Sequence, residues 1–348
     1  MDELKTLIFR TDRIGDFIIS CPFILSYKDK FKNTKIIVIS SEYNSSHIKN
    51  FKFINQIIPL NNETKFFKKL LVLLKMILLL RKTKFSNIIV LDGKKRSFFI
   101  SLFLKGKKSI LLQSKGLEFW SYLFKYKKVI NYELQNQLKN FSFLASLLNF
   151  NINLNKIDIY KNYSFNNIFD FKRKYLNIHL DEKWFTKYYY NDFTDINPTS
   201  DEISLFLDKI SNLIDNDYDI VVTTGSRKLD VLKKYTENFE KINPNIFLKK
   251  NKRNKIFFFD NLSFNDLEFV VKNSSFLVCC EGGVSHVSNA FNVKTIAFFE
   301  RNRLQHTKYW TGHMRNLFLY ERKKMQEIIH DINFYNLIRN NLPKDDNN

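Results

Sequence analysis

Two short segments carry residue types and spacings that could do chemistry. The first is Arg10-Thr-Asp-Arg-Ile-Gly-Asp16, and the second is Glu281-Gly-Gly-Val-Ser-His286. Paired glycines let a backbone approach a ligand closely, and the start of a helix offers unpartnered N–H groups at the positive end of its dipole. Such a turn suits a pyrophosphate, which indicates a nucleotide. The alternative is an ordinary tight turn between a strand and a helix.

The first segment follows an apolar run that reads as a strand. Gly15 lies where this strand turns into a helix, and Asp16 falls in the first turn of that helix. Ligands of an open α/β sheet bind at this edge. A carboxylate at this position either takes a proton from a substrate hydroxyl or simply caps the helix. Asp12 is the rival carboxylate in the same loop, and Arg10 and Arg13 either hold an anionic substrate or pair with these acids.

The elements that would position these residues alternate along the chain between short apolar runs and helical patterns. This alternation predicts doubly wound α/β architecture. In the N-terminal half we expect strands at 5–9, 35–40, 87–91 and 108–112, with helices at about 16–28, 64–82, 96–104 and 132–149. In the C-terminal half we expect strands at 175–179, 219–223, 256–259, 276–280 and 294–299. Capping patterns at Thr199 and Ser263 predict the starts of two helices there.

Length and composition indicate the number of domains, the kind of partner and the compartment. A chain of 348 residues exceeds one comfortable core, so we expect two domains, at 1–160 and 161–340, followed by a disordered tail at 341–348. The net charge of +21 predicts an anionic partner, which is a nucleic acid, an anionic membrane surface or a phosphorylated substrate. The three cysteines form no disulfide framework, which favours a reducing compartment. No apolar run reaches the roughly 18 residues of a membrane span, so we expect a soluble or peripheral protein.

The segment 66–82 allows two interpretations. Leu70–Leu80 is apolar except for Lys75, and basic residues lie on both sides of it. The segment either packs as a helix against the N-terminal sheet or lies partly in an anionic membrane interface.

Taken together, the two chemical segments resemble the lipopolysaccharide heptosyltransferases of glycosyltransferase family 9, which have the GT-B architecture. Arg10–Asp16 is similar to the family's Arg-x-x-x-x-Gly-Asp, and Glu281–His286 is similar to its Asp-(Gly/Thr)-Gly-x-x-His. The resemblance covers about residues 5–310. It implies an α/β fold of two doubly wound Rossmann-like domains facing a central cleft, with the acceptor domain first and the nucleotide-sugar domain second.

The resemblance also implies roles for individual residues. Asp16 would be the catalytic base, and Lys183 would serve the phosphates of the donor. The remaining donor-binding candidates are Thr223, Thr224, Asp230, Leu262, Glu281, Gly282, Gly283 and His286, of which Leu262 could be a plain loop residue and His286 a structural histidine. The acceptor-binding candidates are Arg10, Arg13, Lys94, Lys95 and Arg96. The last three are chosen by their position, because they follow a predicted strand at the same edge of the sheet, and they either contact an anionic acceptor or form a solvated basic face.

The implied function is inverting, metal-independent transfer of a sugar, with heptose from ADP-heptose favoured, onto an anionic glycolipid such as a lipopolysaccharide core. We expect no cofactor, peripheral contact with an anionic membrane, and a place at the cytoplasmic face of the inner membrane of a Gram-negative-type bacterium. Two departures stand out: Glu281 replaces the family's Asp, and a loop at 185–198 looks inserted. A basic nucleic-acid-binding protein, or an inactive family member acting as a binding module, are the alternatives. No nucleic-acid-binding motif accompanies the basic clusters.

Overall fold

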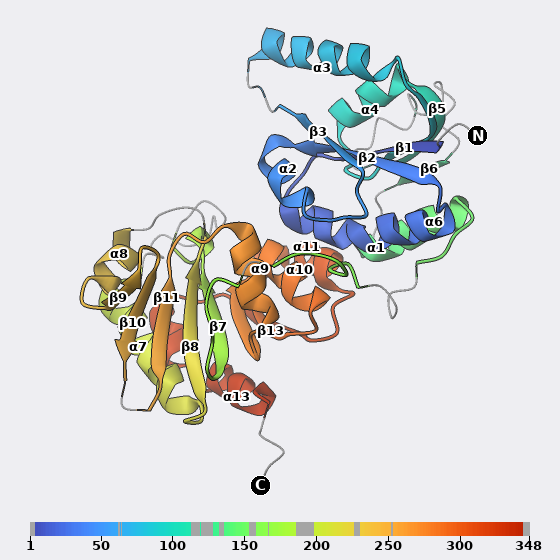
Figure 1. Cartoon of the computed structure of the whole chain (residues 1–348). Helices are drawn as coiled ribbons and strands as arrows, with labels where there is room; N and C mark the ends of the chain where they lie inside the picture. The colour runs from blue at the N-terminus through green and yellow to red at the C-terminus, as the bar shows by residue number, and fades with distance from the viewer. Residues whose placement is uncertain are drawn as a thin grey trace. The chain divides into compact units, whose positions relative to one another are not determined.

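The computed structural model divides the chain into two compact units, Met1–Ser164 and Phe165–Asn348 (Figure 1). Each unit has its own sheet and its own buried core. The residues that the structure describes are 4–61, 63, 65–112, 119, 128–131, 136–152, 158–165, 167–185, 198–225, 230–251 and 253–343.

The described strands of the first unit form a six-stranded sheet in the order β3-β2-β1-β4-β5-β6, and all neighbouring strands are parallel. The strands are β1 (Leu4–Arg10), β2 (Thr34–Ser41), β3 (Gln56–Leu60), β4 (Lys84–Val90), β5 (Lys105–Leu112) and β6 (Lys128–Asn131). The direction in which the chain adds strands reverses between β1 and β4. This reversal opens a crevice at the carboxyl ends of the two strands, which is where doubly wound sheets bind ligands.

Helices cover both faces of this sheet (Figure 1). They are α1 (Ile14–Lys30), α2 (Glu42–Ile48), α3 (Phe66–Leu80), α4 (Lys95–Leu102) and α6 (Gln137–Leu147). Helices α1 and α6 pack side by side, with the rings of Phe23 and Phe141 6.0 Å apart. Helices α3 and α4 lie next to each other and bury Met76, Ile77 and Phe98 against alternate residues of the strands. The predicted doubly wound arrangement is therefore confirmed in this unit.

The described strands of the second unit form an eight-stranded sheet in the order β14-β13-β12-β7-β8-β11-β10-β9. The strands are β7 (Lys174–Leu180), β8 (Tyr218–Thr224), β9 (Glu240–Asn243), β10 (Ile246–Lys250), β11 (Lys255–Phe259), β12 (Phe276–Cys280), β13 (Lys294–Phe299) and β14 (Leu317–Glu321). Strands β9 and β10 pair antiparallel, and so do β10 and β11, which gives the parallel sheet an antiparallel edge. The direction of strand addition reverses between β7 and β12.

The second unit is also covered by helices on both faces. They are the short 3-10 helix η2 (Glu182–Trp184), α7 (Ser200–Leu213), α8 (Asp230–Thr236), α9 (Phe264–Lys272), α10 (Gly283–Ala290), the short 3-10 helix η4 (Arg301–Arg303), α11 (Leu304–Thr311), α12 (Met325–His330) and α13 (Ile332–Asn341). Helix α7 begins with the predicted capping box, in which the Thr199 N–H donates to Glu202 Oε2 at 2.8 Å and the Glu202 N–H donates to Thr199 Oγ1 at 3.2 Å. The predicted Ser263 cap of α9 is also confirmed, because its Oγ accepts the Asp266 N–H at 3.2 Å.

Asparagine occupies turns where glycine is common in other chains. Asn149 follows α6 with φ 63° and Asn292 follows α10 with φ 58°, both in the left-handed region. A left-handed residue after the last turn of a helix lets the backbone satisfy the terminal carbonyls. Accordingly, the N–H of Asn149 donates to Ser146 O and that of Asn292 donates to Asn289 O.

Candidate functional site

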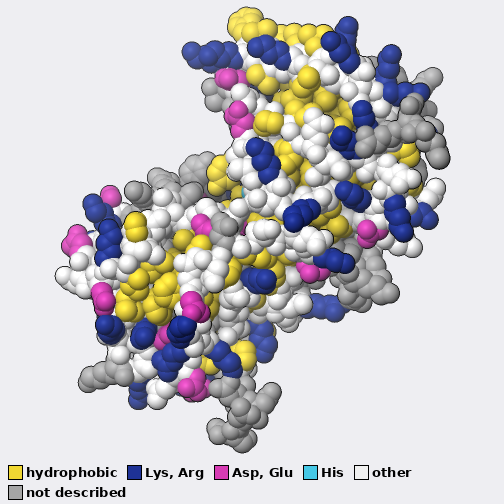
Figure 2. Space-filling model, in the orientation of Figure 1, with side chains coloured by type: hydrophobic (Ala, Val, Ile, Leu, Met, Phe, Trp, Pro, Cys, Tyr) yellow, Lys and Arg dark blue, Asp and Glu magenta, His cyan; other side chains and the backbone are white. Residues whose placement is uncertain are grey.

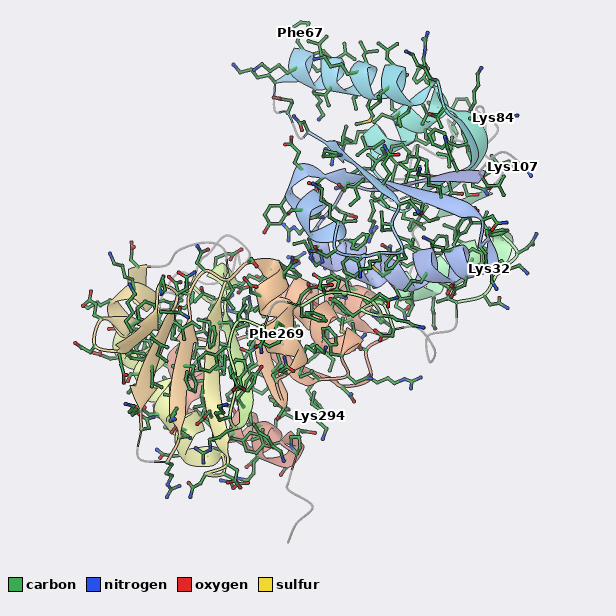
Figure 3. All side chains as sticks on the ribbon, in the orientation of Figure 1. Lys32, Phe67, Lys84, Lys107, Phe269 and Lys294 are labelled. Atoms are coloured by element: carbon green, nitrogen blue, oxygen red, sulfur yellow. The ribbon has the colours of Figure 1, made fainter. Side chains whose placement is uncertain are left out.

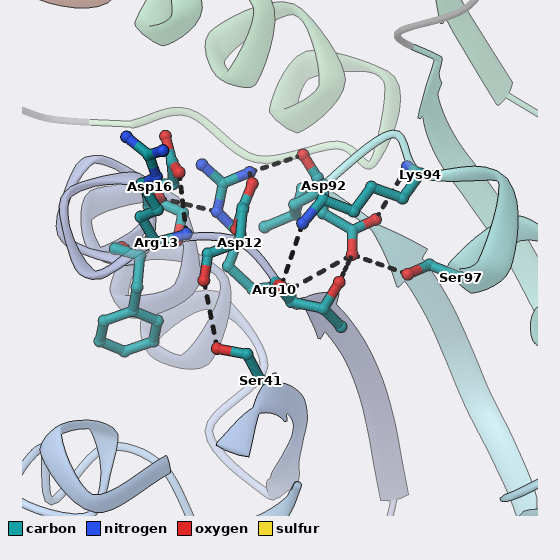
Figure 4. Close-up of polar contacts among 12 residues, drawn as sticks. Arg10, Asp12, Arg13, Asp16, Ser41, Asp92, Lys94 and Ser97 are labelled. Carbon is teal, nitrogen blue, oxygen red and sulfur yellow. Dashed lines mark hydrogen bonds and ion pairs between the residues drawn. The ribbon is translucent and has the colours of Figure 1, made fainter. Parts of the chain in front are cut away.

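The chemical residues of the first unit gather at the carboxyl ends of β1 and β4, where the strand order reverses (Figure 4). The loop after β1 leads into α1, and the loop after β4 leads into α4. The two loops lie side by side because β1 and β4 are paired neighbours. Sequence segments about 80 residues apart are thereby joined into one cluster.

Asp92 connects these two loops. One of its carboxylate oxygens, Oδ2, accepts hydrogen bonds from the Thr11 hydroxyl at 2.6 Å and the Ser97 hydroxyl at 2.7 Å. The other oxygen accepts the N–H of Lys94 at 3.1 Å. Asp92 is completely buried, so these donors replace the water that its charge has lost. Asp92 was not among the predicted site residues, although its position directly after an apolar strand was a usable signal.

Arg10 is buried and holds the loop in place through hydrogen bonds to backbone carbonyls. Its side chain has 0% exposure, its Nε donates to Asp16 O at 2.7 Å, and its Nη1 donates to Leu91 O at 2.8 Å. The guanidinium also lies over the ring of Phe141, 5.6 Å from its centre. Sequence analysis placed Arg10 among the residues that contact the acceptor. In the structure, Nε and Nη1 hold two backbone carbonyls and Nη1 also pairs with Asp12, so the predicted pairing within the loop is found and contact with an acceptor stays a prediction.

Asp12 has a carboxyl pKa far above its ordinary value. Its Oδ2 lies 3.1 Å from Arg10 Nη1, yet burial raises the pKa of Asp12 to about 7, against the opposing effect of the Arg10 charge. Its backbone carbonyl accepts from Ser41 Oγ at 3.3 Å and from the Asn44 amide. Within the described part of the chain, Asp12 Oδ1 and Arg10 Nη2 are buried and have no hydrogen-bond partner. A carboxyl with such a pKa can exchange a proton near neutral pH.

Asp16 lies in the first turn of α1, as predicted. Its Oδ2 accepts the N–H of Arg13 at 3.0 Å, so the carboxylate caps the helix. Arg13 is exposed at the start of the same helix. Asp16 is half-buried, which leaves its carboxylate accessible while the cap fixes its position. The helix-cap interpretation is therefore confirmed, and a cap does not prevent the same carboxylate from contacting a substrate.

Of the three basic residues at the start of α4, two bond the loop after β1 and one is exposed. Lys94 Nζ donates to Thr11 O at 3.0 Å, and Arg96 Nη2 donates to the same carbonyl at 3.1 Å. Both cations thus lie on the loop that follows β1, and burial lowers the pKa of Lys94. Lys95 is exposed. The structure brings Lys94 and Arg96, but not Lys95, into hydrogen-bonding contact with the acidic loop.

In the second unit, the predicted glycine turn lies at the carboxyl end of β12 and opens α10. The Gly282 N–H donates to Ser285 Oγ at 3.2 Å, and Ser285 Oγ donates back to Gly282 O at 2.8 Å. The N–H of Gly282 is therefore used inside the turn. The N–H groups of Gly283 and Val284 lie in the first helical turn, where a helix provides no internal acceptor. They are the groups that can receive an anion here.

Lys183 joins this turn from the neighbouring strand connection. It lies in η2 directly after β7, and β7 is paired with β12. Its Nζ donates to the carbonyl oxygen of Glu281, and a Cβ added at Gly282 would overlap that Nζ. Asp181 fixes the start of η2 by accepting the Lys183 N–H at 3.1 Å, and burial raises the pKa of Asp181, opposed by the Lys183 charge. A lysine ammonium and a helix start are thus held together at the point where the strand order reverses.

The other donor candidates lie on neighbouring elements. The Thr223 hydroxyl is within 3.0 Å of His179 Nδ1 inside the core, and the Thr224 hydroxyl donates to Asp260 Oδ1 at 3.1 Å. Both hydroxyls thus have partners within the protein. Leu262 packs, half-buried, against the apolar cluster beneath the end of β11, and Asp230 is exposed at the start of α8.

Three histidines have their rings in the region of the glycine turn. His286 is buried in α10, and its ring stacks on that of His313 with centres 6.2 Å apart. Burial lowers the pKa of His313 to about 4, so this ring is neutral at physiological pH. His179, beneath Lys183, has a pKa of about 3 because of burial and the nearby lysine charge. Both perturbed rings therefore add no positive charge beside the turn.

Two remaining predictions concern metal binding and the inserted loop at 185–198. Among the described residues, no group of three His, Cys, Asp or Glu side chains is arranged to hold a metal ion. The predicted inserted loop at 185–198 lies outside the described residues except for Phe185 and Pro198.

Comparison with known proteins connects this fold to glycosyltransferases. No family model matches the sequence, and no curated protein matches it. The structure is similar to that of the E. coli heptosyltransferase WaaC with ADP-2-deoxy-2-fluoro heptose, with a TM-score of 0.67 at 13% identity over 97% of this chain and 98% of that chain. It is also similar to a glycosyl transferase family 9 protein from Veillonella parvula DSM 2008, with a TM-score of 0.63 at 10% identity over 97% and 99% of the two chains. E. coli ADP-heptose lps heptosyltransferase II gives a TM-score of 0.61 at 10% identity over 97% and 100%. The predicted GT-B fold is therefore confirmed.

Proposed function

We propose that this protein is a glycosyltransferase that moves a sugar from a nucleotide diphosphate to an anionic glycolipid, with inversion at the anomeric carbon. The favoured donor is ADP-heptose, and the favoured acceptor is a lipopolysaccharide core or a related surface glycan. The observation that carries the proposal is the placement of Lys183 against the glycine turn at the strand reversal of the second unit. The solved structures with the same fold include heptosyltransferases, one of them with an ADP-heptose analogue.

The donor half of the proposal rests on charge. When the bond between sugar and nucleotide breaks, negative charge builds on the leaving diphosphate. The ammonium of Lys183 and the N–H groups of Gly283 and Val284 would stabilise that charge. Preorganised donors of this kind contribute about 3 kcal/mol each to lowering a barrier. They would do so with this chain's own residues, without a step that needs a metal ion.

The acceptor half rests on the cluster in the first unit. The attacking hydroxyl must lose its proton as the new bond forms, and a carboxylate has to receive it. Asp16 is the proposed base, since its helix cap fixes the carboxylate in position. Asp12 is the second carboxyl of the same loop, and its pKa of about 7 suits proton exchange. Lys95 and Arg13 are exposed cations that would hold an anionic acceptor.

The proposed acceptor also implies a location. A lipopolysaccharide core under construction is anchored in the inner membrane, so the proposed enzyme would act in the cytoplasm at that membrane face. The net charge of +21 fits such a surface.

The test is direct synthesis. The purified protein is incubated with a truncated lipopolysaccharide acceptor and ADP-heptose, or with UDP or GDP sugars, and the product is identified by mass spectrometry. We expect one added sugar with the wild type and at least about 100-fold less with Asp16→Asn, in line with the contribution of a general base. Asp16→Asn keeps an oxygen for the helix cap, so nucleotide binding and thermal stability should stay close to wild type. Absence of product with every donor would overturn the proposal in favour of an inactive binding module. An Asp12→Asn variant that loses transfer while Asp16→Asn retains it would reassign the base.

A further inference from the structure

One surface of the first unit is far more apolar than a water-exposed helix should be. Helix α3 buries Met76, Ile77 and Leu80 against the sheet. Its opposite side is also apolar and exposed, as Figure 2 shows. The exposed apolar residues of α3 are Phe66, Phe67, Leu70, Leu71, Leu74, Leu78 and Leu79. A helix whose solvent-facing side carries this many large apolar side chains is normally covered by protein or by lipid.

The exposed side chains form a continuous stripe. Phe67, Leu70, Leu74 and Leu78 recur at intervals of three and four residues, so they share one face of the helix. Phe66 and Phe67 are 73% and 78% exposed. Figure 3 shows Phe67 pointing away from the sheet. Burying two phenylalanine rings that now face water would release about 1.5 to 3 kcal/mol each.

Two further exposed apolar side chains lie on α4 and on the residue that follows it. Helix α4 packs beside α3, and Phe99 and Phe103 are exposed with their rings 5.1 Å apart. We call the exposed apolar residues of α3 together with Phe99 and Phe103 the apolar face. This many exposed large apolar side chains on two neighbouring helices mark an interaction site.

The charge around the apolar face selects the kind of partner. Residues 65–82 contain no acidic residue, and their six basic residues are all exposed. These are Lys65, Lys68, Lys69, Lys75, Arg81 and Lys82. A second copy of this chain would bring the same cations against each other, which disfavours self-association through this face. An anionic lipid surface suits both the apolar face and the basic residues around it, because it accepts apolar side chains below its head groups and attracts cations at its surface.

The length of α3 fits a helix that lies in the plane of the membrane. Its 15 residues extend about 22 Å, less than the roughly 30 Å of a bilayer core. Among the described residues, no helix combines the length and the apolar character needed to cross a membrane.

The position of the apolar face relates it to the acceptor cluster. Helix α3 follows β3 and helix α4 follows β4, so both begin at the carboxyl edge of the sheet, where the Arg10–Asp16 loop lies. The first residues of α4 directly follow Lys94, which bonds that loop. A lipid surface against the apolar face would thus lie beside the proposed acceptor site.

We infer that the apolar face of α3 and α4 docks the protein onto a membrane rich in anionic phospholipid. The inference deepens the proposed function, since a glycolipid acceptor is held in such a membrane. Its test uses vesicles without acceptor or donor, so its outcome does not depend on sugar transfer.

The experiment is cosedimentation of the full chain with vesicles of phosphatidylglycerol and phosphatidylcholine, compared with phosphatidylcholine alone. We expect binding to the anionic vesicles that weakens as salt rises. The double variant Leu74→Glu/Leu78→Glu should bind at least about tenfold more weakly, because two lipid-facing side chains become anions. Both leucines are about half exposed, so the melting temperature should stay near that of the wild type.

The matched control is Leu205→Glu, an exposed leucine of α7 in the second unit, which should bind like the wild type. Equal binding by Leu74→Glu/Leu78→Glu and wild type would overturn the inference. So would the absence of binding to anionic vesicles, or a dimer in solution that the double variant abolishes, which would make a second copy the occupant.

Discussion

The Nη1 atom of Arg10 lies 3.1 Å from Oδ2 of Asp12, with the Arg10 side chain completely buried and that of Asp12 11% exposed. A nearby cation ordinarily lowers the pKa of a carboxyl group. Here burial outweighs the cation and raises the pKa of Asp12 to about 7, with the negative charges of Asp16 and Asp92 acting in the same direction. The loop therefore holds a carboxyl that is partly protonated at neutral pH, next to a guanidinium that also donates to two backbone carbonyls.

The raised pKa of Asp12 predicts a pH-dependent contribution to stability. The folded protein keeps a proton that the unfolded chain releases near pH 3.8, so the stabilisation is complete at low pH and is lost as pH rises through about 7. We expect the melting temperature of the wild type, relative to Asp12→Asn, to fall between about pH 4 and 7 and to level off above that range. Thermal denaturation of both proteins at half-unit pH steps measures this. A difference that does not change with pH would contradict a raised pKa.

The bonds of Arg10 predict a large loss of stability on its removal. Arg10→Ala deletes the donors to Asp16 O and Leu91 O and leaves Asp12 buried without its cation. Breaking one partner of a buried pair typically costs about 3 to 5 kcal/mol. Urea unfolding should show this loss, whereas Arg13→Ala, an exposed arginine of the same loop, should change the free energy of unfolding by no more than about 0.5 kcal/mol. Equal losses for the two variants would show that Arg10 does not organise the loop.

The close approach of Lys183 Nζ to Gly282 predicts that a side chain at position 282 lowers both stability and ADP affinity. Gly282→Ala places a methyl group on Lys183 Nζ, and φ at this position is +156°, which side chains rarely adopt. We expect lower stability and at least about tenfold weaker ADP binding by calorimetry, the size expected when a charge-assisted hydrogen bond is lost. In the double variant Gly282→Ala/Lys183→Ala the methyl group gains room. Part of the stability should return, but ADP affinity should not, and recovery of both would show that Lys183 does not bind the phosphates.

Glu281 predicts a change in donor preference. Its N–H donates to Phe298 O at 3.0 Å and its carbonyl accepts from Lys183, so the backbone is held without help from the carboxylate. Glu281→Asp therefore shortens the carboxylate's reach by one methylene with little effect on the melting temperature. We expect kcat/KM for the native donor to fall about 10-fold or more, the scale of one displaced hydrogen bond to a charged group. If the wild type is inactive and Glu281→Asp is active, the glutamate is the cause of the lost transferase activity.

Much of the fold could be predicted because buried parallel strands appear as short apolar runs. The strands at β1, β2 and β12 and the capped start of α7 were found in this way. The outermost strand β9 was missed, since every one of its residues is exposed and its sequence, Glu-Lys-Ile-Asn, has no apolar alternation. Strand signals depend on burial, and an exposed edge strand does not provide one.

The candidate site was predicted less completely. The glycine turn and Asp16 were found because helix starts have a sequence signature. The burial of Arg10 could not be foreseen, because the residue that ends a strand can point to either side of the sheet. Asp92 was missed since a carboxylate is recognised as buried only when its donors are known, and these come from separate elements: Thr11 from the loop after β1 and Ser97 from helix α4.

Among the described residues, every non-glycine residue with positive φ is an asparagine, at positions 149, 162, 261 and 292. The asparagine amide can bond its own backbone, which makes the left-handed conformation less costly for it than for other side chains. A chain with only 8 glycines can in this way still reverse direction sharply after its helices. Some of the many asparagines of this chain thus occupy backbone positions where other side chains would be strained. The glycine content alone therefore underestimates how many tight turns such a protein contains.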